Sequence, residues 1–230
     1  MPSKKHIYFT GCTGETGKRL LNNLIARNDI SEIHLLTRAP TGIKNPKVFE
    51  HFVDFDYLTK LKISPNEISE KIEIISYCTL GTTIKKAGSK SNFRKVDYDY
   101  VVDFAKWAIE NNSQQLAVVS SLDANPNSNS FYLRTKGEME RSIKKLPWKT
   151  IWILRPSLLI GEREEFRLAE FIGGLVSKLV SPFLIGSLRR YRPINIDDVA
   201  TALASLPFSS DVGVNVLQGD QIIERAKRYQ

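Results

Sequence analysis

Short apolar runs alternate with longer amphipathic segments along most of the chain. In the first long segment, Leu20, Leu21, Leu24 and Ile25 recur on one helical face. This alternation is typical of βαβ units that build a parallel sheet. We therefore expect an α/β fold, a Rossmann-type doubly wound parallel sheet. Its strands are predicted at residues 6–10, 32–37, 51–54, 72–78, 115–120, 149–155 and near 213–217.

Helices are expected between these strands. The pattern predicts them at about residues 15–27, 92–111, 134–145, 166–179 and 197–206. Pro40, Gly42 and Pro46 interrupt the segment 39–50, so no helix is predicted there. Since no repeat or low-complexity linker divides the chain, residues 1–230 are expected to form a single domain.

A glycine-rich loop follows the first predicted strand and leads directly into the first predicted helix. Gly11 would permit a tight turn, Gly14 would let the backbone approach a pyrophosphate, and Gly17 would let the helix pack close to the strand. The unpaired N–H groups and the dipole of the helix attract a phosphate at the same point. The loop therefore predicts dinucleotide binding, and the alternative is an ordinary βα turn that binds nothing.

The end of the second strand indicates which dinucleotide binds. An acidic residue there favours NAD, whereas an arginine accommodates the 2′-phosphate of NADP. Arg38 stands at this place and indicates NADP, and the alternative is a solvated arginine at a strand end. Asp54 and Phe55, at the end of the third strand, are expected where the adenine ring lies.

Candidate catalytic residues follow the fifth strand. Tyr132 and Lys136 are four residues apart, so they share one face of a helix. An ammonium group stabilises a tyrosinate, which lets the hydroxyl exchange a proton with a substrate. Ser121 would project into the crevice where α/β folds bind ligands and would hydrogen-bond the substrate oxygen. Ser120 is the alternative for this role, and either hydroxyl could instead be satisfied by the backbone.

Segments spread over most of the chain carry a combined resemblance to a known family. They are Gly11-Cys12-Thr13-Gly14-Glu15-Thr16-Gly17, Val53-Asp54-Phe55, Cys78-Thr79-Leu80-Gly81-Thr82-Thr83, Ser120-Ser121, Phe131-Tyr132-Leu133-Arg134-Thr135-Lys136-Gly137-Glu138 and Leu154-Arg155-Pro156-Ser157-Leu158-Leu159. In this order they resemble the short-chain dehydrogenase/reductase superfamily, in its atypical, Tat-interacting-protein-like branch of NADPH-binding proteins. The resemblance implies an NAD(P)-binding Rossmann domain.

The resemblance also implies roles for individual residues. The residues implied to line the diphosphate are Gly11, Thr13, Gly14, Glu15, Thr16 and Gly17. Arg38 would meet the 2′-phosphate. Those implied at the ribose, the nicotinamide and its carboxamide are Leu80, Gly81, Thr82, Lys136, Pro156, Ser157 and Leu158. The catalytic serine, tyrosine and lysine of the family would be Ser121, Tyr132 and Lys136. The connection between Ser121 and Tyr132 is shorter than in many classical members of the family.

Two functions fit these residues. One is an NADPH-dependent oxidoreductase that reduces a carbonyl of a small molecule, as a monomer or homodimer. The other is an NADPH-binding regulatory or sensor protein that acts through protein partners with little catalysis. Isomerase or epimerase chemistry with a retained cofactor is a further alternative. Residues 161–192 contain several arginines around an apolar helix and are expected to form a small C-terminal lid or substrate segment, an oligomer face or a solvated rim.

Composition and residue spacing argue against several other classes of protein. The formal net charge is +8, but the basic residues are spread along the chain without a nucleic-acid-binding module, so nucleic acid is not expected as a partner. His6, His34, His51 and the two cysteines are scattered in sequence, so no metal site is expected. No transmembrane segment is expected, because Lys178 interrupts the longest apolar stretch, which is shorter than a span of about 20 residues. With no secretion signal recognised, a cytoplasmic protein is expected.

Overall fold

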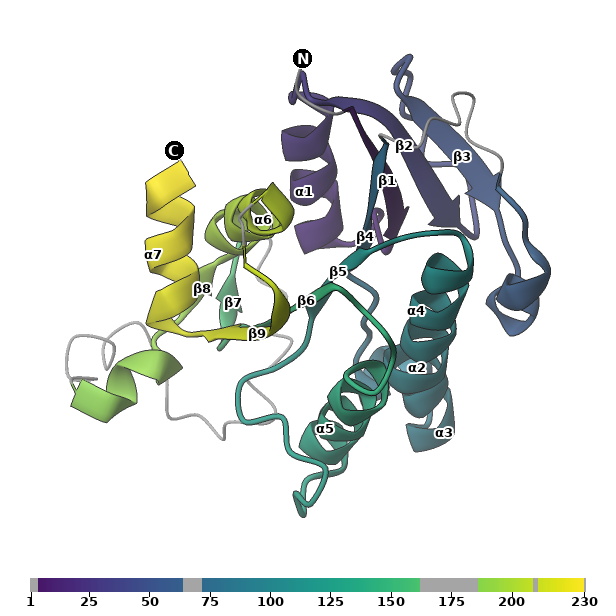
Figure 1. The fold of residues 1–230 in the computed structure, drawn as a ribbon. Helices are drawn as coiled ribbons and strands as arrows, with labels where there is room; N and C mark the ends of the chain where they lie inside the picture. Colours follow the sequence, from purple (N-terminus) through teal and green to yellow (C-terminus); the bar gives the residue numbers. More distant parts are fainter. Residues whose placement is uncertain (1–3, 64–71, 162–185, 209–210, 230) are drawn as a thin grey trace.

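Seven parallel strands form the central sheet of the computed structural model, which describes residues 4–63, 72–161, 186–208 and 211–229 (Figure 1). The strands are β1 (Lys5–Thr10), β2 (Ile30–Thr37), β3 (Val48–Phe52), β4 (Glu73–Cys78), β5 (Gln115–Val119), β6 (Thr150–Arg155) and β9 (Gly213–Gln218). Beside the sheet, β7 (Leu159–Ile160) pairs in parallel with β8 (Ile194–Asn195).

The strand order predicts a crevice at the carboxyl ends of the central strands. It runs β3-β2-β1-β4-β5-β6-β9, so the chain first winds outward from β1 to β3 and then crosses back to β4 beside β1. All neighbouring strands of this sheet are parallel. A reversal of winding direction leaves a space at the carboxyl ends of the strands where such folds bind ligands. The predicted Rossmann-type fold is therefore confirmed.

Helices cover both faces of the sheet (Figure 1). One face carries α1 (Glu15–Ile25), α6 (Ile196–Ser205) and α7 (Asp220–Tyr229), and the other carries α4 (Tyr100–Glu110), α5 (Phe131–Ile143) and the 3-10 segment η1 (Phe55–Lys60). The short helices α2 (Ile84–Ala87) and α3 (Lys90–Arg94) precede the π-helical segment η2 (Lys95–Asp99), which continues into α4. The 3-10 segments η4 (Gly186–Tyr191) and η5 (Leu206–Phe208) lie near α6 in the chain.

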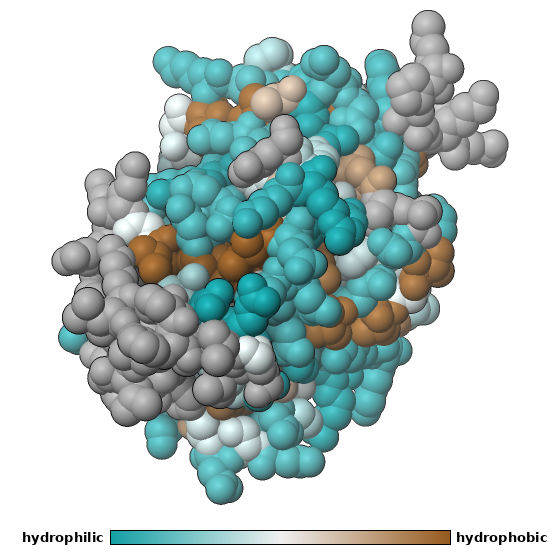
Figure 2. Space-filling model, turned by 90° about the vertical axis from the view of Figure 1, so that its left-hand side faces the viewer, coloured by the Kyte–Doolittle hydropathy of each residue, from teal (hydrophilic) through white to brown (hydrophobic). Residues whose placement is uncertain are grey.

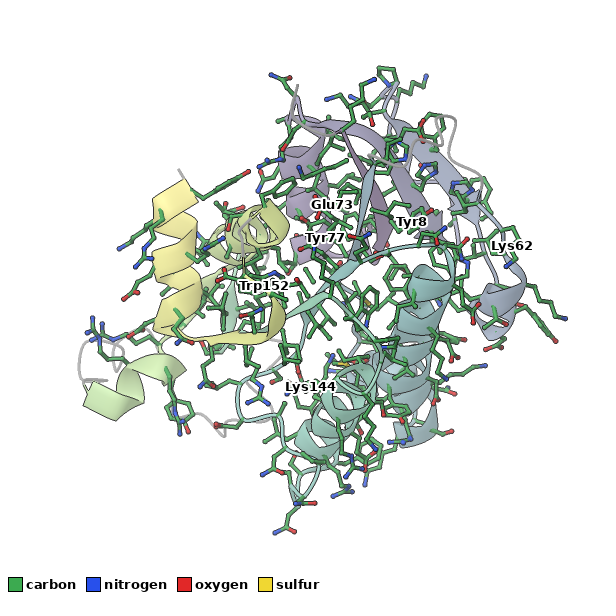
Figure 3. All side chains as sticks on the ribbon, viewed as in Figure 1. Tyr8, Lys62, Glu73, Tyr77, Lys144 and Trp152 are labelled. Atoms are coloured by element: carbon green, nitrogen blue, oxygen red, sulfur yellow. The ribbon has the colours of Figure 1, made fainter. Side chains whose placement is uncertain are left out.

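The core consists of two apolar layers, one on each side of the sheet. Tyr77 and Trp152, labelled in Figure 3, belong to the layer under α1, α6 and α7. Tyr8, labelled in the same view, belongs to the layer under α4 and α5, where its ring lies 5.0 Å from that of Trp107. Because the central strands are buried on both faces, they appear in the sequence as apolar runs rather than as strict alternation.

The structure differs from the predicted elements at several places, most clearly at β3, the helix after α2, α5 and α7. β3 spans Val48–Phe52 rather than 51–54, and the predicted helix 92–111 is divided into α3, η2 and α4. α5 begins at Phe131 rather than 134, because the Ser130 hydroxyl caps it by accepting from the Leu133 N–H. α7 was not predicted; its apolar face is narrow, with Ile222 and Ala226 buried. The predicted helix 166–179 lies outside the described residues.

The face of the molecule that carries α7 is mostly hydrophilic (Figure 2). Figure 2 views the side of the molecule that carries α7 and shows charged and polar side chains with an apolar band between them. None of the helices in the described part of the chain is long and apolar enough to cross a membrane.

Candidate functional site

The glycine loop between β1 and α1 is shaped by two close approaches. Gly11 has φ +86°, and a Cβ there would lie 2.5 Å from the carbonyl carbon of Thr79. A Cβ on Gly17 would lie 2.1 Å from the Gly11 oxygen, so only glycine lets α1 start this close to the strand. At Gly14 the nearest atom to an added Cβ is 3.4 Å away, an ordinary contact. The chain itself therefore requires glycine at Gly11 and Gly17, whereas Gly14 leaves room beside the backbone.

A cleft of about 500 Å³ lies where β1, β2 and β4 end. Predicted cofactor-binding residues from all three strand ends line it, namely Gly11, Thr13, Gly14, Arg38, Leu80, Gly81 and Thr82. Arg38 is exposed and directly follows β2. The cleft occupies the switch point of the sheet, where the strand order predicts a ligand site.

Residues that the sequence did not single out as binding residues complete the lining. They are Thr79, Lys86, Ala87, Asn92, Lys95, Val96 and Tyr100. Two of them are lysines, and together with Arg38 they make the cleft basic, which favours an anionic ligand. The Lys95 ammonium lies 2.7 Å from the Asp56 carboxylate, which positions it. The signal in the sequence was the pair Lys85-Lys86, which looks like any solvated basic cluster until the fold places it.

Other predicted cofactor residues are not among those that line the cleft. In the first turn of α1, Glu15 pairs with Arg19 at 3.0 Å, and Thr16 lies beside it. Asp54 caps η1 by accepting from the Asp56 N–H at 3.0 Å. Phe55 is buried in the core and packs 5.2 Å from the ring of Tyr100, which does line the cleft. Phe55 therefore supports the cleft wall from behind.

Pro156, Ser157 and Leu158 follow β6 and connect to neighbouring loops. The Pro156 carbonyl accepts from the Leu122 N–H, and the Ser157 hydroxyl donates to the Arg192 carbonyl. The Leu158 carbonyl accepts from the Ile194 N–H at 2.9 Å. These contacts tie the loop after β6 to the segments after β5 and η4.

A buried ion pair borders the cleft. Lys136 Nζ lies 2.7 Å from Asp97 Oδ1, and the side chains are 5% and 1% exposed. Asp97 Oδ2 accepts from the Thr82 N–H at 2.9 Å. A Cβ on Gly81 would lie 3.5 Å from Asp97 Oδ1 and 3.8 Å from Lys136 Nζ, so the pair lies directly behind the cleft wall. Burial alone would lower the pKa of Lys136, but the charge of Asp97, with a smaller contribution from Tyr132, raises it.

Asp97 is a further site residue that sequence reasoning missed. It lies in the π-helical segment η2, and such segments occur often at functional sites because they re-aim a side chain inside a helix. In the sequence it is an aspartate within a predicted helix, where a solvent-facing position is the usual expectation. The contact with Lys136 joins segments that lie far apart in the chain.

Tyr132 and Lys136 share one face of α5, as their spacing predicted. Tyr132 is partly buried in the first turn of the helix, with its ring 5.6 Å from that of Phe93. The phenol interacts electrostatically with the Lys136 ammonium. The structure thus brings Tyr132, Lys136 and Asp97 together, but Tyr132 is not among the residues that line the cleft.

The two candidate serines differ in their contacts. The Ser120 hydroxyl donates to Glu140 at 2.6 Å, and Arg155 binds the same carboxylate through two hydrogen bonds of 2.8 and 2.6 Å. Ser120 is therefore part of a buried network that joins β5, α5 and β6. Ser121 is buried and donates to the adjacent Leu122 carbonyl at 3.3 Å, a long contact to backbone. Its role toward a substrate stays a prediction.

Comparison with known proteins identifies relatives of this chain. The family model described as HIM1 matches residues 39–178. Protein HTATIP2 of Rattus norvegicus is 30% identical over 73% of this chain and 68% of its own length. The protein FMP52, mitochondrial, of Candida albicans is 30% identical over 94% of this chain and 92% of its own length.

A solved structure with the same fold binds a nicotinamide dinucleotide. MoeE5 in complex with UDP-glucose and NAD matches 97% of this chain and 81% of its own, with a TM-score of 0.64 and 14% identity. At this identity the likeness shows the fold, and the fold is that of nucleotide-binding oxidoreductases and epimerases.

The names of the relatives correct one expectation. FMP52 proteins of Candida albicans and Emericella nidulans are both named mitochondrial, which contradicts the expectation of a cytoplasmic protein. The expectation was wrong because it rested on not recognising a targeting segment in the sequence. With a family model that covers more than half of the chain and relatives that align over nearly all of it, the chain belongs to the HIM1 family, together with the HTATIP2 and FMP52 proteins.

Proposed function

We propose that this protein is an NADPH-dependent oxidoreductase of the short-chain dehydrogenase/reductase type that reduces a carbonyl of a small molecule. One observation carries the proposal. A single cleft has the glycine loop and Arg38 on one part of its lining and Gly81, with the Lys136–Asp97 pair behind it, on another. A dinucleotide needs both parts, because its adenosine, which carries the 2′-phosphate, and its nicotinamide ring lie at opposite ends of the central pyrophosphate.

The residues of the cleft fit NADPH. Gly14 is the N-cap of α1 and provides no side-chain cap, so the first N–H groups of this helix are left for a phosphate. Gly14 also leaves space for close approach, and Arg38 and Lys86 supply positive charge. We infer that these residues hold the phosphates and that Leu80, Gly81 and Thr82 border the nicotinamide half. When bound, NADPH supplies the hydride that the carbonyl carbon accepts.

The chain's own residues would then handle the proton. The Tyr132 hydroxyl donates a proton to the carbonyl oxygen, and Ser121 orients that oxygen by a hydrogen bond. Lys136 remains protonated at neutral pH because its pKa is raised, so its positive charge favours the tyrosinate left behind. Asp97 fixes the position of the ammonium group through the 2.7 Å ion pair.

The test is oxidation of NADPH in the presence of a panel of aldehydes, ketones and quinones. Tyr132→Phe should lower turnover at least about 100-fold, since a positioned acid contributes that much, while NADPH affinity stays close to wild type. Tyr229→Phe, an exposed tyrosine on α7, is the matched control and should keep full activity. Full turnover in Tyr132→Phe would refute this proton donor, and no NADPH loss with any carbonyl would refute the reductase.

A second function is favoured by the ion pair itself. Asp97 neutralises the Lys136 ammonium in a buried setting, which weakens the help that Lys136 gives to Tyr132. An NADPH-binding regulatory or sensor protein with little catalysis would tolerate this neutralisation. Tight NADPH binding by calorimetry without turnover on the panel, together with protein-partner binding that changes with NADPH, would favour this function over the reductase.

We also propose that residues 1–230 act as one NAD(P)-binding Rossmann domain with residues 161–192 as its lid or substrate segment. Most of that segment lies outside the described residues. In its described part, Arg189 lies 3.4 Å from Asp220, and Arg190 lies 4.0 Å from Asp123, which also accepts from the Tyr191 hydroxyl. These contacts connect the end of the segment to α7 and to the loop after β5, close to the candidate serines.

A further inference from the structure

All three histidines of the chain lie on one face of the sheet, on neighbouring strands. His6 of β1 is in register with Glu32 of β2, and His34 follows two residues later on the same face. His51 of β3 lies two residues beyond Phe49, the register partner of His34. Tyr8, labelled in Figure 3, marks this face, which α4 covers. Parallel strands thus gather residues that looked scattered in the sequence.

Three of these side chains direct donor atoms to a common point. His34 Nε2 lies 2.9 Å from Glu32 Oε2, and His6 Nδ1 lies 3.7 Å from the same oxygen. One ligand atom from each of the three residues lies within 4.8 Å of the other two. Zinc bonds to nitrogen and oxygen of about 2.0–2.2 Å give ligand separations near 3.4 Å in a tetrahedron. The separations of 2.9 and 3.7 Å lie on either side of this value.

A fourth residue fixes the orientation of His34. The Nδ1 atom of His34 lies 3.0 Å from His51 Nε2, and the two rings stack at 29°. When Nδ1 donates its hydrogen to His51, the lone pair of Nε2 faces Glu32 and becomes a ligand. Metal-binding histidines are usually held in this way by a hydrogen bond from the other ring nitrogen.

Burial makes a cation favourable at this point. His6 is 0%, His34 3% and Glu32 7% exposed, so the carboxylate has lost most of its hydration. A buried carboxylate requires a compensating positive group. Two imidazoles and one carboxylate are ligands that suit Zn²⁺ better than Mg²⁺ or Ca²⁺, which prefer oxygen only.

We propose that His6, Glu32 and His34 form a zinc-binding site, with His51 as the residue that orients His34 and with water in the fourth position. His6 and Glu32 lie near the amino ends of β1 and β2 and His34 lies in the middle of β2, whereas the cleft lies at the carboxyl ends of the strands. The role of the zinc site is therefore to join β1 to β2, and through His51 to β3, rather than to act on the substrate. The expectation of no metal site rested on sequence spacing, which the sheet register overrides.

The experiment titrates Zn²⁺ and Co²⁺ into the full chain, purified without a histidine tag and freed of metal by a chelator. Calorimetry should give one ion per chain, and bound zinc should raise the unfolding temperature. Glu32→Gln should weaken zinc binding by more than about 100-fold, and His51→Gln by about 10-fold to 100-fold, the usual cost of losing an outer hydrogen bond. Glu224→Gln, an exposed carboxylate on α7, is the matched control and should bind as wild type does.

X-ray absorption of the zinc-loaded wild-type chain gives a readout that does not depend on whether a variant folds. It should show two imidazole ligands and oxygen ligands at about 2.0–2.2 Å. Zinc bound with one imidazole or none, zinc affinity unchanged in folded Glu32→Gln, or no zinc binding by the wild-type chain would each overturn the proposal. In the last case the cluster is a hydrogen-bonded His–Glu pair without metal.

Discussion

Lys136 and Asp97 form a buried ion pair behind the cleft wall. Both are almost fully buried, and each would be an isolated charge without the other. Removing one partner of a buried pair is costly because the remaining charge has neither water nor a counter-ion. The pKa of Lys136 is raised from 10.5, so the pair is intact at neutral pH. The stability that comes from the raised pKa of Lys136 is complete below pH 10.5 and is lost as the pH rises through the higher pKa of Lys136 in the folded state.

We therefore predict that Asp97→Asn destabilises the protein by about 3–5 kcal/mol at pH 7. The measurement is urea unfolding followed by circular dichroism. Asp103→Asn is the control, because Asp103 pairs with Lys106 at 3.5 Å on the exposed face of α4. That variant should lose no more than about 0.5 kcal/mol. Equal losses in the two variants would contradict a special role for the buried pair.

At the scale of elements, the β1–α1 unit depends on the absence of a side chain at Gly17. In most helices an alanine is about 1 kcal/mol better than glycine. Here the Cβ would lie 2.1 Å from the Gly11 oxygen and 2.9 Å from the Cys12 Cα, so the backbone must shift. The clash outweighs the helix preference and separates α1 from the strand.

Gly17→Ala should therefore lower the free energy of unfolding by about 1–3 kcal/mol, the usual cost of overpacking. Gly14→Ala is the matched variant in the same loop, since its Cβ meets only the Gly11 oxygen at 3.4 Å. We expect it to change stability little and to weaken NADPH binding instead. Thermal unfolding and NADPH titration of both variants separate the two effects. A Gly17→Ala protein as stable as wild type would show that the loop relaxes freely.

An element could be predicted where its pattern lies within a short stretch of sequence. The strands and α1 were predictable because each is a run or a 3.6-residue pattern within one window of sequence. The edge strand β3 was displaced in the prediction, since its side chains are only partly buried and give a weak pattern. The divided helix at Lys90–Glu110 could not be predicted, because the π-helical segment that aims Asp97 at Lys136 is stabilised by that distant contact.

At the scale of the whole molecule, the cleft lies where three strands end. A ligand that binds there contacts all three and stabilises the folded state as a whole. A ligand that binds only the folded state stabilises it by about 2.7 kcal/mol at 100 times its dissociation constant. For a chain of 230 residues this corresponds to a rise of roughly 5–10 °C in unfolding temperature. In the proposed function Arg38 distinguishes between the two dinucleotides, since only NADPH carries the 2′-phosphate.

We predict that NADPH raises the unfolding temperature more than NADH at equal concentration. Arg38→Ala should remove most of the difference and leave the effect of NADH unchanged. Arg228→Ala, an exposed arginine on α7, should behave as wild type does. Differential scanning fluorimetry provides the measurement. A larger shift with NADH than with NADPH in the wild-type chain would contradict the assignment of NADP.

The sequence by itself determined the α/β architecture, the glycine loop, the pairing of Tyr132 with Lys136 on one helix face and the position of Arg38 at a strand end. These features are local, because each depends on residues within a few positions of one another. Tertiary structure alone decided that Asp97 pairs with Lys136, that Ser120 belongs to the Glu140 network, and that His6, Glu32 and His34 meet. Such contacts join residues from different strands and helices, and only the register of the sheet and the packing of helices on it bring them within reach.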